Sequence, residues 1–474
     1  MTKRPSVIVI LIDTLRADHL SCYGYPYRTS SFIDQLTDRS ILFQNAVAPA
    51  PWTFPVHASL FTGRYPTEHG ATNQHLKLEP SLPTLAELLS GAGYRTAGFS
   101  NNAWVGRATG LARGFQYFEE IPSSLPRVAR GKQLFIRLAK KLRQLGLRRV
   151  RRAEKTFGNV LLWIEDHLSR HGDHPFFVFV NLMEVHAPYL PPVQFAKPFL
   201  PSGVRSRDAY QVDQNMDKYN AGVLPINDYT LGVLEALYNG EIAYMDNQIR
   251  RFCRELECVG LLEETLLIIT SDHGENLGDH GLMEHQYCLY DTLLHVPLIL
   301  HWPAASLGGR VVQGQVPVLH LFDTVLDLSQ VEWPCAPTGR PYSLLDRLDG
   351  RGDTAPILAE YSESVIQVRR LRKHVPDFDD PWMLTDMRCI RMDGYKLIQR
   401  DQVGEELFDL QADPGEQRNL IDQEDRRAAR LRAALAERCR RLVSAELGGE
   451  SVEEEVEQMD DEVVERLRGL GYLT

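Results

Sequence analysis

Three runs of nearly uninterrupted apolar residues stand out along the chain, at positions 7–12, 176–183 and 265–269. Such runs, without alternation of polar and apolar positions, are typical of strands buried on both faces of a parallel sheet. Each run is followed by acidic or histidine side chains, namely Asp13, Glu184 with His186, and Asp272 with His273. Asp13 alone could equally be a helix N-cap. Because ligands bind outside the carboxyl ends of strands in α/β sheets, the repeated design favours one shared site.

The rest of the pattern predicts alternating helices and strands, and then a change of style near residue 336. Apolar positions at helical spacing predict helices at 29–39, 82–89, 231–261 and 426–442, and a strand is expected at 94–100. Residues 193–228 show no clear period, so we expect a loop there. Further on, an Asp-Gly pair within 387–398 predicts a β-hairpin. We therefore expect a large α/β domain over residues 1–335 and a smaller subdomain over residues 336–474.

A proline-stiffened segment precedes a predicted helical turn that ends at Gly63. Thr53 would then lie near the N-terminus of a helix, where backbone N–H groups favour an anion. His57 follows four residues later, on the same helix face. Without further motifs, Thr53 would be interpreted only as a helix cap.

Charge and cysteine content narrow the class of protein. The formal net charge of -11 argues against nucleic acid as a general partner. The seven cysteines are scattered without metal-type spacing, which fits reduced thiols in the cytoplasm. Lys3 and Arg4 before an apolar run resemble a signal peptide, but Asp13 interrupts that run and no cleavage site follows, so we expect a strand and no export. The chain has no apolar run of the roughly 18 residues that a membrane span needs.

One segment departs from the acidic whole. Residues 127–155, within an insertion at about 122–160, are rich in Arg and Lys, with Glu154 their only acid, and carry leucines at helical spacing. Such a helix could contact an anionic membrane through Arg127–Lys155. We favour the alternative of a solvated helical insertion, because basic runs are often only surface.

The polar residues at the strand ends have a shared chemistry. Asp13, Asp272 and His273 offer hard oxygen donors and one imidazole, a set that suits Mn²⁺, Ca²⁺, Mg²⁺ or Zn²⁺. A cation beside Thr53 would stabilise its alkoxide and one oxygen of a tetrahedral phosphate or sulfate. The remaining oxygens could be bound, or a leaving group protonated, by three histidines: His57, His186 and His285.

Five motifs in this order resemble the sulfatase family of the alkaline phosphatase superfamily. They are Ile12-Asp13-Thr-Leu-Arg-Ala-Asp18, Thr53-Phe-Pro-Val-His57-Ala-Ser-Leu-Phe-Thr-Gly-Arg64, His186-Ala-Pro-Tyr-Leu-Pro-Pro, Ser271-Asp-His-Gly-Glu-Asn-Leu-Gly-Asp-His-Gly and Val296-Pro-Leu-Ile. The segment Gly394-Tyr-Lys-Leu-Ile, with Glu406-Leu-Phe-Asp-Leu, resembles that family's small C-terminal sheet. The resemblance covers nearly the whole chain except the basic insertion.

The resemblance implies a fold, a cofactor and a reaction. The fold would be a large, mixed, mostly parallel sheet between helices, with a small C-terminal antiparallel sheet and helix. One divalent cation, with Mn²⁺ or Ca²⁺ favoured, would support hydrolysis of an anionic sulfate or phosphate ester. Metal ligands would be Asp13, Asp272 and His273, with Thr14 in place of a second acidic or amide ligand. The substrate-binding positions would be His186, His285 and Arg64.

The nucleophile position departs from the family pattern. Sulfatases carry Cys or Ser in a Cys/Ser-x-Pro-x-Arg motif and oxidise it to formylglycine, whereas this chain has Thr53-Phe-Pro-Val-His57. Threonine cannot give that aldehyde, but a phosphothreonine can be resolved by in-line attack on phosphorus. We therefore lean towards hydrolysis of phosphate or phosphonate esters. The alternatives are a phospho-head-group transferase acting on a lipid or sugar, a strict sulfatase, and a non-catalytic binding protein. The sequence leaves the oligomeric state open.

Overall fold

The structure is a computed structural model that describes residues 4–121, 152–305, 307–333, 342–348, 355–442 and 452–469. The predicted basic helix at 127–155 lies outside these residues, except that 152–155 form the start of α6 (Arg152–His171). Among the described residues, none of the helices is both long and apolar enough to span a membrane.

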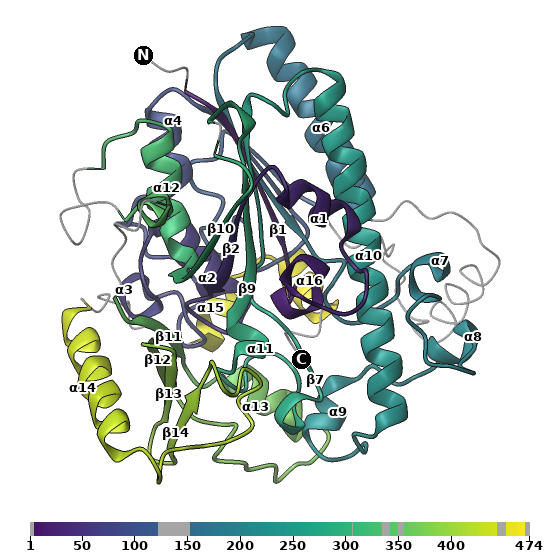
Figure 1. Ribbon diagram of the computed structural model, residues 1–474, viewed down its shortest axis with the longest axis vertical. Coiled ribbons are helices and arrows are strands. Elements are labelled where there is room, and N and C mark those ends of the chain that lie inside the picture. Colours follow the sequence, from purple (N-terminus) through teal and green to yellow (C-terminus); the bar gives the residue numbers. More distant parts are fainter. Residues whose placement is uncertain are drawn as a thin grey trace.

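An eight-stranded sheet forms the centre of the molecule, in the order β10-β2-β9-β6-β1-β5-β3-β4 (Figure 1). Its strands are β1 (Ser6–Ile12), β2 (Ile41–Val47), β3 (Arg95–Ser100), β4 (Tyr117–Glu120), β5 (Phe176–Leu182), β6 (Thr265–Thr270), β9 (His295–His301) and β10 (Arg310–Pro317). Seven of them run in one direction and β9 runs against both of its neighbours. The predicted large, mixed, mostly parallel sheet is confirmed.

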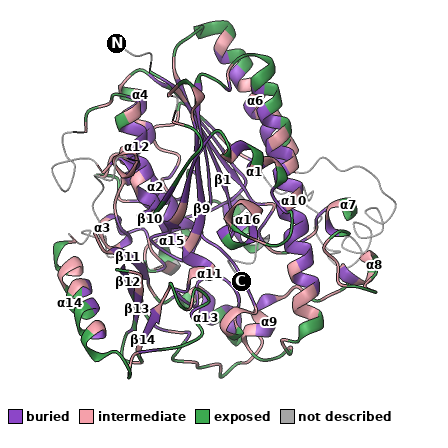
Figure 2. Cartoon of the chain, in the orientation of Figure 1, coloured by how far each residue is buried: buried purple, intermediate pink, exposed green. Residues whose placement is uncertain are grey.

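Helices cover both faces of this sheet, which explains why its central strands are apolar throughout. Val7, Val9 and Leu11 of β1 belong to one core, whereas Ile8, Ile10 and Ile12 belong to the other. The first core is closed by α2 (Thr53–Thr62), α4 (Leu85–Gly91) and α12 (Leu321–Leu328), and the second by α1 (Ser31–Thr37), α6 and α10 (Asp228–Cys258). Figure 2 shows the sheet buried between these two layers, with α6 exposed along its outer face, whereas α2 is buried along its whole length.

A second, antiparallel sheet holds β11 (Ile357–Tyr361), β12 (Met387–Met392), β13 (Tyr395–Arg400) and β14 (Gly404–Asp409). The predicted Asp-Gly hairpin joins β12 to β13, with Asp393 at φ 54° and Gly394 at φ 79°. One face of this sheet packs against α14 (Asp425–Arg441). Its other face adds to the first core, and so do α15 (Val452–Glu457) and α16 (Asp461–Gly469) near the C-terminus.

Residues 193–228 differ from the loop that the sequence pattern predicts. They contain three helices of about one turn each: α7 (Val193–Ala196), α8 (Ser206–Ala209) and α9 (Met216–Asn220). The prediction was wrong because a single turn is too short to show a helical period. A local cap marks α9, where the Asn215 side chain accepts a hydrogen bond from the backbone N–H of Lys218.

Candidate active site

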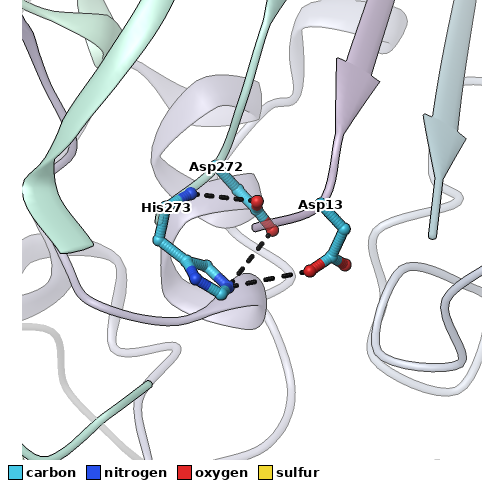
Figure 3. Close-up of side chains that lie close together, drawn as sticks. All are labelled: Asp13, Asp272 and His273. Atoms are coloured by element: carbon cyan, nitrogen blue, oxygen red, sulfur yellow. Dashed lines mark hydrogen bonds and ion pairs between the residues drawn. The ribbon is translucent and has the colours of Figure 1, made fainter. Parts of the chain in front are cut away.

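The register of β1 against β6 brings together the two acids that follow these strands. Leu11 pairs with Thr270 in parallel, so Asp13 and Asp272 leave the sheet at the same edge. Together with His273 they form a fully buried group whose candidate ligand atoms all lie within 4.8 Å of one another. Figure 3 shows the two carboxylates and the imidazole directed at a common point.

The hydrogen bonds around this group leave its ligand atoms facing inward. Asp272 Oδ1 accepts from the backbone N–H groups of His273, at 2.9 Å, and Thr14, at 3.3 Å. His273 Nδ1 donates to the Gly274 carbonyl at 2.9 Å, so the lone pair of Nε2 is directed at Asp13 Oδ1 and Asp272 Oδ2, at 3.9 and 3.6 Å. Those two oxygens are buried and accept no hydrogen bond.

This donor set fits a divalent cation. Burial and the charge of Asp13 raise the pKa of Asp272, while burial, with the nearby His285, lowers the pKa of His273. Two buried carboxylates with orphaned oxygens and a neutral imidazole carry uncompensated negative charge. A hard or borderline cation would supply that compensation, with two oxygen ligands and one nitrogen ligand from the protein.

Thr14 borders this group and has a backbone conformation that few residues other than glycine adopt. Its φ is 59°, and the Tyr238 hydroxyl holds its carbonyl oxygen at 2.7 Å. The Thr14 hydroxyl is buried and has no hydrogen-bond partner. It is therefore available as a further oxygen donor, and its role as a ligand stays a prediction.

Thr53 is the first residue of α2 and lies against the metal-site residues. Its Oγ1 is 3.4 Å from His273 Nε2 and 3.4 Å from Asn102 Nδ2, and the side chain is fully buried. The helix N-terminus places partial positive charge beside this hydroxyl. His57, one turn later, donates from Nδ1 to the Thr53 carbonyl at 2.8 Å and lies 3.7 Å from Asp272 Oδ2. Burial lowers the pKa of His57 to about 4, so its imidazole is neutral at pH 7.

Asn102 is a site residue that the sequence pattern did not single out. Its Oδ1 accepts from the Trp104 N–H at 3.0 Å, which directs Nδ2 to Asp13 Oδ2, at 2.8 Å, and to Thr53 Oγ1. Asn102 thus links a metal-site carboxylate to the hydroxyl of Thr53. The sequence feature that could have indicated Asn102 is that it follows β3, which lies beside β5 in the sheet.

His186 and His285 border the same cluster from two loops. The His285 ring centroid is 4.5 Å from that of His273 and 5.2 Å from that of His186. Glu275 Oε1 lies 3.0 Å from His285 Nδ1 and orients that ring. Burial lowers the pKa of His285, but the hydrogen bond and the charge of Glu275 outweigh it, so this pKa is raised.

Arg64 is the predicted site residue that the structure does not bring to the cluster. It follows Gly63, which ends α2 with φ 67°, whereas Thr53 begins that helix. Ten residues of helix correspond to about 15 Å. The substrate-binding role of Arg64 stays a prediction without support from this placement.

The chain matches the family model of sulfatases over residues 5–331, and it therefore belongs to the sulfatase family. Residues 278–445 also match the model of the N-sulphoglucosamine sulphohydrolase C-terminal region. Enzymes of this family bind a divalent metal ion, and the buried Asp13, Asp272 and His273 offer a matching ligand set. The protein is a sulfatase-like ester hydrolase, as its family and its relatives show.

The chain is similar in sequence to several named proteins and in fold to solved structures. The chain is 27% identical over 446 residues to the uncharacterized sulfatase YidJ of Escherichia coli K12, covering 89% of this chain and 84% of that one. It is 26% identical over 362 residues to the human iduronate 2-sulfatase, and the match covers 69% of this chain and 64% of that one. The fold is that of the phosphonate monoester hydrolase of Agrobacterium radiobacter, with a TM-score of 0.71 at 22% identity, over 93% of this chain and 96% of that one.

Proposed function

We propose that this protein hydrolyses phosphate or phosphonate esters with Thr53 as the nucleophile. The observation that carries the proposal is the position of the Thr53 hydroxyl, 3.4 Å from both His273 Nε2 and Asn102 Nδ2 at a helix N-terminus. Asn102 Nδ2 can donate to an alkoxide at this position, and the helix dipole also favours the anion. Since threonine carries a methyl group on Cβ, its oxidation would give a ketone and not the formylglycine aldehyde.

The reaction would proceed in two displacements at phosphorus. In the first, Thr53 Oγ1 loses its proton to solvent and bonds to phosphorus, the bond to the leaving oxygen breaks, and protonated His186 or His285 gives that oxygen a proton. In the second, water attacks the phosphothreonine and gives a proton back to that imidazole, the Oγ1–phosphorus bond breaks, and Oγ1 regains a proton from solvent. His57 hydrogen-bonds the Thr53 carbonyl, which fixes the first turn of α2 while this happens.

Asp13, Asp272 and His273 would hold one divalent cation, with Thr14 Oγ1 as a further ligand. When bound, the cation supplies positive charge that favours the Thr53 alkoxide and polarises the ester. We propose Mn²⁺ or Ca²⁺, with Mg²⁺ or Zn²⁺ as alternatives, because oxygen donors outnumber nitrogen in this set. The contact of Arg127–Lys155 with an anionic membrane and the cytoplasmic location stay predictions.

A strict sulfatase is the second candidate, because relatives across most of the chain are named as sulfatases. They include the human iduronate 2-sulfatase and the arylsulfatase of Clostridium perfringens, which is 25% identical over 462 residues. A sulfated Thr53 has no carbonyl to re-form, so sulfate would leave only by attack at sulfur. If water instead attacks the sulfate ester directly, this candidate predicts sulfate ester turnover that does not pass through Thr53.

The test compares initial rates on matched aryl phosphate, phosphodiester, phosphonate and sulfate esters. The protein is stripped of metal and reloaded with each of the four cations. We expect Thr53→Ala to lower the phosphoester or phosphonate rate about 10³-fold or more, because the covalent step is lost. Rapid acid quench and mass spectrometry should find a phosphate on Thr53 in the wild-type protein.

The matched control is Thr62→Ala, which removes a buried hydroxyl from the other end of α2. It should leave the rate within about threefold, since Thr62 Oγ1 donates to the Ala58 carbonyl. Sulfate turnover that survives in Thr53→Ala would overturn the threonine mechanism and support the second candidate.

A further inference from the structure

The loop that carries His285 has unusual backbone geometry on both sides of this residue. Glu284 has φ 68° and Gln286 has φ 88°. Non-glycine residues in such conformations persist only where surrounding contacts hold them. The β7 (Asn276–Leu277) and β8 (Met283–Glu284) ribbon pairs Asn276 with Glu284, and this pairing brings Glu275 opposite His285. The contacts of Glu284 therefore bear directly on how His285 is presented.

Glu284 is held from the C-terminal part of the chain. Arg370, on α13 (Val365–Arg372), donates from Nη2 to both Glu284 oxygens, at 3.2 and 3.0 Å. The same guanidinium pairs with Asp217 of α9, at 2.8 Å from Nη2 and 3.1 Å from Nε. Arg370 and Glu284 are each 6% exposed, so water screens these charges little. Figure 1 shows α13 and α9 beside β7, at the end of the molecule where these segments meet.

Glu284 interacts with the imidazoles of the site as well as with Arg370. Burial raises the pKa of Glu284, but the charges of Arg370, His285 and His186 outweigh it, and the pKa is lowered. Arg370 is the strongest of these partners. If the guanidinium were removed, His285 and His186 would remain as groups whose charge can compensate the buried carboxylate.

We propose that Arg370 is a positioning residue for the ester anion, acting through Glu284. By holding the Glu284 carboxylate on its guanidinium, Arg370 prevents it from competing with the substrate's anionic group for the imidazoles of His186 and His285. The C-terminal subdomain is thereby part of the active site. The inference rests on ester hydrolysis at this site and is independent of whether Thr53 is the nucleophile.

The test uses four variants of the full chain: Arg370→Gln, Glu284→Gln, the double variant, and Arg400→Gln. Arg400 is the matched control because it is 2% exposed and pairs with Glu406, at 3.2 Å, within the C-terminal sheet. Two readouts are taken for each variant. The first is KM and kcat on whichever aryl ester the wild type hydrolyses fastest, and the second is the Kd of inorganic phosphate and of sulfate by calorimetry.

We expect Arg370→Gln to raise KM and the anion Kd about tenfold or more, because a buried carboxylate loses its partner. The double variant should return both values to within about threefold of wild type, because the carboxylate that would compete for the two imidazoles is gone. Arg400→Gln should lower the melting temperature but leave KM within about twofold. If no ester is hydrolysed, the proposed reaction fails while the anion Kd still tests this inference.

Three results would overturn it. One is an unchanged anion Kd in Arg370→Gln, and another is a double variant that binds anions no better than the single one. The third comes from Glu284→Gln, which keeps Arg370 paired with Asp217 and remains informative if Arg370→Gln does not fold. This variant should bind phosphate as well as or better than wild type, and a tenfold weaker Kd would show that Glu284 itself is required.

Discussion

Two of the carboxylate clusters in the described part of the chain differ in the charges that surround them. At the carboxyl ends of β1 and β6, Asp13 and Asp272 each leave one oxygen without a hydrogen bond. Between α11 (Asp291–Leu294) and the C-terminal sheet, Asp291 Oδ1 instead lies 2.8 Å from Lys396 Nζ and 3.1 Å from Arg391 Nη1. In the first cluster the two negative charges of Asp13 and Asp272 face each other. In the second cluster Asp291 faces two cationic side chains.

The pKa shifts follow from this difference in neighbours. Burial raises the pKa of both Asp272 and Asp291. At Asp272 the charge of Asp13 raises it further, whereas at Asp291 the charges of Arg391 and Lys396 outweigh burial and lower it. Burial therefore has opposite outcomes in the two clusters, because two cationic side chains face Asp291 and the like charge of Asp13 faces Asp272. This contrast predicts that the Asp291 cluster serves stability and that the cluster of Asp13 and Asp272 serves chemistry.

The largest expected effect comes from Asp272→Asn. This change removes one of two like charges, so bound metal should be lost and kcat/KM should fall about 10³-fold or more. The free energy of unfolding of the metal-free protein should stay within about 1 kcal/mol of wild type or rise. Metal content by mass spectrometry, initial rates, and urea denaturation in chelator measure the three quantities.

The same substitution in the other cluster, Asp291→Asn, serves as the matched control. It should retain the metal and destabilise the protein, because Lys396 and Arg391 lose a shared partner. If Asp272→Asn destabilised the metal-free protein as much as Asp291→Asn does, the contrast between the clusters would be refuted.

Lys396→Met tests the same comparison by removing a cation, and not a carboxylate, from the second cluster. Lys396 Nζ lies 2.8 Å from both Asp291 Oδ1 and Glu416 Oε1 and is fully buried. Without it, Glu416 loses its cationic partner and Asp291 keeps Arg391, so the free energy of unfolding should fall by about 3–5 kcal/mol. Urea denaturation at pH 7 measures the loss. Adding Glu416→Gln should recover part of it, and no recovery would mean that charge pairing is not the cause.

The metal cluster could be predicted from sequence because its signals are local. An apolar run identifies a buried strand, and the acid or histidine that ends it is read off directly, as at Asp13 and Asp272. Strand order then places these ends together. Thr53 followed from the prolines and from Gly63, which define the helix that Thr53 begins.

The remaining parts depend on contacts between distant segments. Asn102 contacts Asp13 only because β3 and β5 lie side by side in the folded sheet. Lys396 contacts Asp291, which lies 105 positions earlier in the chain. Nothing in the spacing of Arg370 indicates its contact with Glu284, 86 positions earlier. Arg64 comes after the C-terminal end of α2, whereas Thr53 begins that helix, so its predicted role in substrate binding gains no support from the helix and stays a prediction.

His69 is a buried titratable residue whose two ring nitrogens are both hydrogen-bonded while the imidazole is neutral. It adds a third environment to the two carboxylate clusters, and its expected effect is the smallest. His69 Nδ1 accepts from the Ala71 N–H at 3.1 Å and Nε2 donates to Ser59 Oγ at 2.9 Å. Burial lowers the pKa of His69 to about 3, against 6.5 in the unfolded chain. Its contribution to stability is therefore complete above pH 6.5 and is lost as pH falls below that value, by about 2 kcal/mol at pH 5.

Urea denaturation in chelator at pH 7.5, 6 and 5 measures this loss. Many buried histidines contribute to the acid slope, so the test compares slopes: His69→Gln should be shallower than wild type, whatever its stability at pH 7.5. The exposed His171 provides the control, since His171→Gln should leave the slope unchanged. Equal slopes in wild type and His69→Gln would mean that the native structure accepts a proton at His69. In that case the two hydrogen bonds of His69 would not be enough to keep its imidazole neutral. Only neighbouring charges, as in the two carboxylate clusters, would then decide the protonation state of a buried group in this protein.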